Sequence, residues 1–209
     1  MAQSKLTTLS QQRSAKDLEL MSRDSIKWLS GKIDQLRNPS SRIPSTIRDD
    51  DREKLVNLTS NSMLGRLYFF YYNPKTKDDL PYYDKFPLVL VLDNYKDGIL
   101  ALNLHYLPPK YRIMFIQKLL ENSGVGVQYT KDYDIKRLKI TYDILKYTTS
   151  LKEFRPCIKR YLYKQMGSKF LAVAPNEWDT AILLPVQQFK KAKASEVWSD
   201  SMSEARKKE

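Results

Sequence analysis

The stretch FPLVLVLDNYKDGILALNLHYL, residues 86–107, decides the fold class. It holds two apolar runs of strand length, 86–92 and 99–107, and the segment between them contains Asp97-Gly98, a dipeptide that favours a tight hairpin turn. Nearly every residue of the first run is apolar, so we expect a strand that is covered on both faces. Two prolines at 108–109 end the second run. We therefore predict a β-hairpin in the middle of the chain.

Further strands are predicted on either side of this hairpin. The aromatic run GRLYFFYY at 65–72 precedes it and is ended by Pro74, while apolar runs at 169–173 and 180–184 follow it. Strands, then helices, then strands again predict an α+β protein. The simplest closed arrangement is a small, split, SH3-like β-barrel with a helical insertion at about 108–167.

Apolar residues at helical spacing predict the helices. In the insertion they predict helices over 110–121 and 135–147. A capping-box pattern, Ser150 followed by Glu153, predicts a third helix that runs to Gly167. A helix over 14–36 is predicted before the barrel, from the following apolar positions: Leu18, Met21, Ile26, Leu29, Ile33 and Leu36.

The composition divides the chain into three predicted parts. These are an N-terminal arm with short helices at 1–62, a β-barrel core at 63–189 and a polar C-terminal tail at 190–209. We expect both ends to extend from the core as arms. Trp198 is an isolated tryptophan in the tail, and it either anchors a partner protein or folds back on its own domain. Trp28 is a second candidate partner anchor.

The net charge of +12 is concentrated in the middle of the chain. Residues 110–170 hold 14 Lys and Arg against 5 Asp and Glu, an excess of nine positive charges. Such a concentration favours nucleic acid or an acidic protein as partner, although a solvated helical face gives the same pattern. Tyrosines are interleaved with these charges, and aromatic rings stack on bases. The outward face of the third predicted helix supplies the candidate binding residues: Lys152, Arg155, Lys159, Arg160 and Lys164.

The usual catalytic and metal-binding patterns are missing. A single histidine, His105, and a single cysteine, Cys157, cannot assemble a Cys/His zinc site. No phosphate-binding glycine loop and no nucleophile elbow is present. The acidic residues near the strands, Asp78, Asp79 and Asp84, lack the spacing of a magnesium site. We therefore predict a protein that is not an enzyme and that takes no cofactor, no metal and no small-molecule substrate.

Some polar residues instead suit a structural role. We expect Tyr82, Tyr83, Asp84 and the NLHY segment at 103–106 to shape the surface of the core, with His105 as a satisfied strand residue. No apolar run approaches the roughly 18 residues that a membrane span needs. The N-terminus lacks the apolar segment of a secretory signal. We expect no membrane partner.

Several blocks of this chain resemble small virion proteins of T4-like contractile-tailed bacteriophages. The resemblance covers about residues 64–199 and includes no catalytic motif. Its blocks are GRLYFFYYNPKTKDDLPYYDKFPLVLVL (65–92), GILALNLHYLPPKYR (98–112), FRPCIKRYLY (154–163), FLAVAPNEWDTAILLPVQQF (170–189) and VWSDS (197–201). They are similar to the DNA end-protector or head-completion type, or else to a tail or baseplate component.

This resemblance implies a virion protein that is made in the host cytoplasm. It implies first a non-enzymatic structural component, a basic adaptor that binds other virion proteins at a tail, baseplate or head–tail junction. The alternative is a protector protein that binds the double-stranded DNA ends of the packaged genome. The resemblance transfers no active residues, so the five basic residues remain the candidate contacts in either case.

Overall fold

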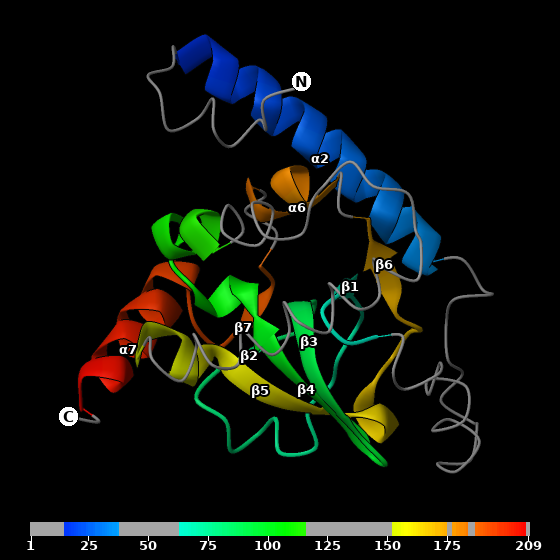
Figure 1. Ribbon diagram of the computed structural model, residues 1–209, viewed down its shortest axis with the longest axis vertical. Helices are drawn as coiled ribbons and strands as arrows, with labels where there is room; N and C mark the ends of the chain where they lie inside the picture. Colours follow the sequence, from blue (N-terminus) through cyan, green and yellow to red (C-terminus); the bar gives the residue numbers. More distant parts are fainter. Residues whose placement is uncertain (1–14, 38–62, 116–151, 175–176, 184–186, 208–209) are drawn as a thin grey trace.

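A five-stranded antiparallel sheet forms the centre of the protein (Figure 1). The computed structural model describes residues 15–37, 63–115, 152–174, 177–183 and 187–207. The strands of the sheet are β1 (Leu67–Phe69), β3 (Leu88–Tyr95), β4 (Gly98–Asn103), β5 (Ile158–Leu162) and β6 (Leu171–Val173), in the order β5-β4-β3-β1-β6. A separate two-stranded ladder pairs β2 (Tyr83–Asp84) with β7 (Phe189–Lys190).

Strand β3 is covered on both faces, as its continuous apolar sequence predicts. Leu88, Leu90 and Leu92 belong to the larger of two core clusters. Val89 and Val91, which alternate with them, belong to the smaller cluster on the other face. A one-residue slip of this strand would exchange the two sets of side chains, so the packing on both faces fixes the register of the sheet.

Three helices cover the larger cluster: α2 (Ala15–Arg37), α6 (Trp178–Leu183) and α7 (Ala194–Lys207). Helix α2 lies beside α6 on one side of the molecule, and α7 lies at another side (Figure 1). Helix α7 packs against the 3₁₀ turn η4 (Lys152–Cys157), which leads into β5. The larger cluster is therefore enclosed by the sheet and by segments from both ends of the chain.

Several predicted elements are confirmed. These are the central hairpin, the strands on both sides of it and the N-terminal helix. The strands predicted over 65–72 and 169–173 correspond to β1 and β6. Leu29, Ile33 and Leu36 of α2 pack on the larger cluster as expected, whereas Ile26 is 52% exposed. The helix predicted from residue 110 is present at 109–115. Its remainder and the helix predicted over 135–147 lie outside the described residues.

Two predicted elements are wrong. The third helix of the insertion is instead η4, strand β5 and a second 3₁₀ turn, η5 (Tyr163–Gln165). Pro156 cannot donate a helical hydrogen bond, and pairing with β4 satisfies the backbone that follows. Residues 180–183 of the strand predicted over 180–184 belong instead to α6, where Trp178, Ala181 and Ile182 recur at helical spacing and are buried.

The C-terminal segment is part of the core rather than an extended polar arm. Helix α7 buries Val197, Ser201 and Ala205, which follow one another at four-residue spacing along one face. Two of these residues are small and one is polar, so the stripe has too little hydrophobicity to stand out in the sequence.

The α+β class is confirmed, but the sheet is open in the described part of the chain. Strands β5 and β6 form its two edges and do not pair with each other. The segment between them approaches β1 through a single bridge that joins Tyr72 and Met166.

Gly98 sets how closely β4 and β5 approach. A Cβ on this residue would lie 2.1 Å from the carbonyl oxygen of Tyr161. We expect Gly98→Ala to displace β5 and to lower the free energy of unfolding by about 3 kcal/mol, measured by urea denaturation. Gly31→Ala, at an exposed site of α2 with open space around it, is the control and should raise that free energy by up to about 1 kcal/mol. Unchanged stability of Gly98→Ala would contradict this account.

Candidate functional site

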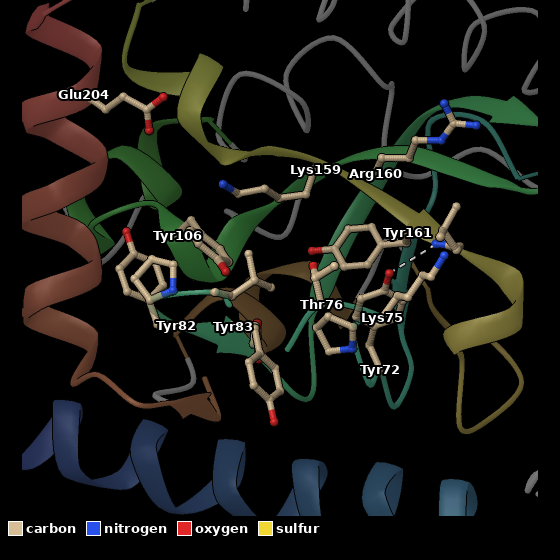
Figure 2. Close-up of a pocket in the computed structure, with 15 residues that line it drawn as sticks. Tyr72, Lys75, Thr76, Tyr82, Tyr83, Tyr106, Lys159, Arg160, Tyr161 and Glu204 are labelled. Carbon is tan, nitrogen blue, oxygen red and sulfur yellow. Dashed lines mark hydrogen bonds between the residues drawn. The ribbon is translucent and has the colours of Figure 1, made fainter. Parts of the chain in front are cut away.

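A groove of about 560 Å³ lies between strand β5 and the loop that joins β1 to β2 (Figure 2). This volume is in the range of roughly 300–1,000 Å³ that is typical of ligand-binding sites. Its lining is rich in tyrosine and carries basic residues. The tyrosines are Tyr72, Tyr82, Tyr83, Tyr106 and Tyr161, and the basic residues are Lys75, Lys159 and Arg160.

The tyrosine rings of the groove are packed against one another. Tyr72 and Tyr161 meet edge to face with ring centroids 4.9 Å apart. Tyr82 and Tyr106 lie 6.0 Å apart, and both rings pack against Phe189 of β7. Tyr72, Tyr106 and Tyr161 are almost fully buried, whereas Tyr82 and Tyr83 are half-buried. The last two therefore present most of the ring surface that a ligand could reach.

The phenol groups of Tyr82, Tyr106 and Tyr161 stay protonated over the physiological range. Burial, together with the nearby carboxylates of Asp200 and Glu204, raises the pKa of Tyr82 to about 12. Burial also raises the pKa of Tyr106 and of Tyr161 well above the ordinary tyrosine value. The tyrosines thus form a neutral surface, able to hydrogen-bond, that does not repel an anion.

Two basic residues of β5 line the groove in different ways. The Lys159 ammonium lies 4.7 Å from the centroid of the Tyr106 ring, a cation–π distance. Arg160 forms an exposed ion pair with Asp97, with Nη2 and Oδ1 2.6 Å apart, and its guanidinium lies over the Tyr95 ring. Figure 2 shows Lys159 above Tyr106, whereas the Arg160 guanidinium points away from the tyrosines that line the groove. Lys159 is therefore the closer of the two to the aromatic surface.

A buried polar network holds the groove in place from behind. The Asp84 carboxylate accepts hydrogen bonds from the Phe86 amide, at 3.0 Å, and from the Asn103 side chain, at 3.2 Å. His105 Nδ1 lies 2.6 Å from Asp84 Oδ2. The same Asn103 amide nitrogen donates to the Tyr161 hydroxyl at 2.9 Å. These bonds join β2, which carries Tyr83, to the end of β4 and to β5, which carries Tyr161.

His105 is a structural residue of this network. It is fully buried, and this burial lowers its pKa. The Asp84 carboxylate favours the charged imidazolium, and the Arg112 guanidinium disfavours it. The neutral ring donates from Nδ1 to Asp84, while Nε2 has no hydrogen-bond partner among the described residues. The prediction that residues 82–84 and 103–106 shape the core surface fits this arrangement. His105, however, lies in a 3₁₀ turn (Leu104–Tyr106) instead of a strand.

Residues 7–201 match the family model of the Phage T4 terminal DNA protecting protein. The chain belongs to this family. No curated protein and no solved structure matches the sequence of this chain. The family match confirms the resemblance to T4-like phage proteins and selects the DNA end-protector type.

The five basic residues predicted to bind nucleic acid or an acidic partner do not share a helical face in this member of the DNA protecting family. Lys152 and Arg155 belong to η4, Lys159 and Arg160 to β5, and Lys164 to η5. They follow an edge strand and its two flanking turns, and each is exposed or half-buried. The predicted helix that would have aligned these residues is replaced by η4 and β5, because of Pro156 and the pairing with β4. The binding role of the five residues stays a prediction.

The two tryptophans named as partner anchors both make contacts within the chain. The Trp198 indole donates to the His105 carbonyl at 2.8 Å, so this residue folds back on its own domain, the second of the two alternatives. Trp28 donates to Glu177 at 2.9 Å, and Lys32 forms an ion pair with the same carboxylate. These contacts attach α7 and α2 to the core. A further role in partner binding stays a prediction.

In the part of the chain that the structure covers, no three His, Cys, Asp or Glu side chains gather as metal ligands. None of the helices described there is long and apolar enough to cross a membrane. The tyrosine groove is the feature that sequence reasoning missed. Its lining combines residues 72–84 with residues 106 and 159–162, and the only signal was the density of tyrosine in the first of these segments.

The single histidine allows a test of the buried network by pH. Because the folded state holds His105 neutral, the unfolded chain binds more protons below its pKa of about 6.5. The free energy of unfolding should therefore fall by up to about 1.4 kcal/mol between pH 7.5 and pH 5.5. Denaturant titrations at several pH values measure this fall. His105→Gln should be less stable but should lose the pH dependence, and retention of the same dependence in that variant would contradict the assignment.

Proposed function

We propose that this chain binds the ends of double-stranded DNA and shields them from exonucleases, without catalysing a reaction itself. The observation that carries the proposal is the match of nearly the whole chain, residues 7–201, to the terminal DNA protecting family. The net charge of +12 and the exposed basic residues along β5 are consistent with a polyanionic partner. No cofactor is required for this role.

The basic edge of the sheet is the proposed contact with the DNA backbone. Lys152, Arg155 and Lys164 are exposed on the two turns that flank β5, and Lys159 and Arg160 lie between them. Each phosphate that such a side chain neutralises releases condensed counterions. Binding through these five residues should therefore weaken steeply as the salt concentration rises.

The family match bears on the choice between the two functions that the sequence suggested. A structural adaptor at a tail, baseplate or head–tail junction was the first reading, and a DNA end protector was the alternative. The family description fits the alternative better. We propose that the protein is made in the host cytoplasm and remains on the genome ends in the virion, where other virion proteins are further partners.

We also propose that the sheet is the split, SH3-like barrel that the sequence predicts. The edge strands β5 and β6 follow one another in the chain, with the 3₁₀ turn η5 between them. The bridge between Tyr72 and Met166 attaches the connecting segment to the residues that follow β1. A crystal structure in which this segment pairs with both edges would support closure through it; one in which it pairs with neither would exclude closure.

Protection of linear DNA from an exonuclease tests the proposed function. We expect the full chain to slow digestion of a linear duplex and to leave the rate of an endonuclease on circular DNA unchanged. Gel analysis over time, with Mg²⁺ present for the nucleases, measures both rates. Mg²⁺-dependent cleavage by the chain alone, lost on replacing Asp78, Asp79 or Asp84, would overturn the non-enzymatic reading.

The salt dependence of binding tests the basic edge. Replacing Lys152, Arg155 and Lys164 by Gln should reduce the slope of log Kd against log salt by about 2 to 3, because each phosphate contact contributes roughly 0.9. Fluorescence anisotropy with labelled duplex measures the slope. Lys27→Gln, at an exposed site of α2, is the control and should leave the slope unchanged. Equal slopes for the triple variant and the parent would place the DNA contact elsewhere.

A further inference from the structure

We infer that the tyrosine groove holds the unpaired terminal nucleotide of a DNA strand, so that the chain recognises an end by its exposed base. The inference rests on the proposed function and deepens it. Contacts with phosphates are alike along the whole duplex, so they cannot tell an end from the interior. A groove that accepts a single unstacked base can make this distinction.

The size of the groove selects an unpaired nucleotide. Its volume of about 560 Å³ suits a small ligand and does not admit a duplex. A base from the interior of a duplex would have to leave its pair and both stacking neighbours, whereas a base that is already single-stranded avoids most of this cost. The groove is therefore most easily filled at a frayed end or at an overhang.

The tyrosines provide a surface for stacking. Tyr82 is half-buried, and its ring is supported from behind by Tyr106 and Phe189. Tyr83, the next residue, lines the same groove. Stacking of bases on aromatic rings tolerates any sequence, because every base has a π face. A protector of DNA ends that must act on whatever base is terminal needs this tolerance.

The charges around the groove fit a nucleotide better than a bare phosphate. Lys159 from β5 and Lys75 from the opposite loop supply positive charge for the phosphates next to the base. Glu204 of α7 also lines the groove, and a carboxylate accepts hydrogen bonds from the amino groups of bases while it repels a free phosphate. Asp84 contributes little to the ligand because its oxygens already accept the bonds of the buried network.

The loop wall of the groove is held in place before any ligand arrives. The Lys191 ammonium donates to the carbonyl oxygens of Lys77, Asp78 and Leu80 at 2.8, 2.8 and 3.0 Å. Lys191 itself has a φ of 70°, in the left-handed region, which a lysine adopts at a cost that these three bonds offset. A wall fixed in this way avoids part of the ordering entropy of binding.

Four DNA molecules with the same duplex sequence test the inference. Two are hairpins whose open end carries a short unpaired overhang, one at the 3′ end and one at the 5′ end, and whose other end is closed by a linker without bases. The third is the same hairpin with a blunt end, and the fourth is a dumbbell closed at both ends by that linker. Competition against a labelled overhang hairpin, measured by fluorescence anisotropy with the full chain, gives the relative affinities. We expect the overhang to bind about tenfold more tightly than the dumbbell.

Two variants change the groove in opposite ways. Tyr82→Ala removes the stacking surface, and Thr76→Trp fills the groove from an exposed loop position. Each should reduce the preference for the overhang to less than about threefold while the salt-dependent affinity for the dumbbell is kept. Lys27→Gln, at an exposed site of α2 outside the groove, is the control and should bind as the parent does. Thermal unfolding of each variant establishes that it is folded, and a folding defect in one variant leaves the other to decide.

The outcomes separate this inference from the proposed function. If the parent prefers open ends and both folded variants keep that preference, the groove does not hold the terminal base, while end binding stands. If the parent binds the dumbbell as tightly as the open hairpins, end binding itself is overturned and the inference with it. Loss of the preference in both variants, with dumbbell affinity intact, supports the groove as the site that reads the end.

Discussion

The Asp84 carboxylate, which is 3% exposed, has to be satisfied inside the protein, and much of the described structure follows from how this is done. A buried carboxylate without partners is too costly to retain. Its partners are the Phe86 amide, the Asn103 side chain and His105. Phe86 precedes β3, Asn103 ends β4 and His105 lies in the 3₁₀ turn that follows β4. The network therefore connects the two-stranded ladder to the main sheet.

The groove is a consequence of this connection. Once Asp84 is attached to the end of β4, the preceding Tyr82 lies beside Tyr106, and Asn103 binds the Tyr161 hydroxyl. Tyrosines that are distant in sequence therefore come to line a single surface. The network also explains why a buried polar cluster is retained next to two large apolar clusters, since it specifies the relative position of two sheets that apolar packing alone would leave less well defined.

The sequence was informative where periodicity and burial agree. The continuous apolar run of β3 and the hairpin after it were predictable because a strand with both faces covered needs no polar alternation. Strand β5 was not predictable, because its sequence, IKRYL, has apolar residues at a spacing that also suits a helix. These residues form a strand because they pair with β4. Helix α7 was missed since Ser201 and Ala205 give its buried face little hydrophobicity.

The candidate site was predictable only in its charged half. Lys159 and Arg160 were identified from the excess of positive charge, which is a property of composition. The tyrosines of the groove were not identified as a site, because Tyr161 of the same strand meets Tyr72 only through tertiary structure.

In the function we propose, the two halves of the site perform different physical tasks, and neither is sufficient by itself to protect DNA ends. A basic edge binds any stretch of duplex with an affinity that depends on salt, so it brings the protein to DNA without choosing a position on it. A neutral aromatic groove contributes little long-range attraction, but it accepts a base only where stacking has already been lost. Lys159 belongs to both halves, because its ammonium lies over the Tyr106 ring while β5 carries it among the other cations. An arrangement of this kind holds the protein near the backbone by charge and stops it where the strand ends, which is the position at which an exonuclease has to begin.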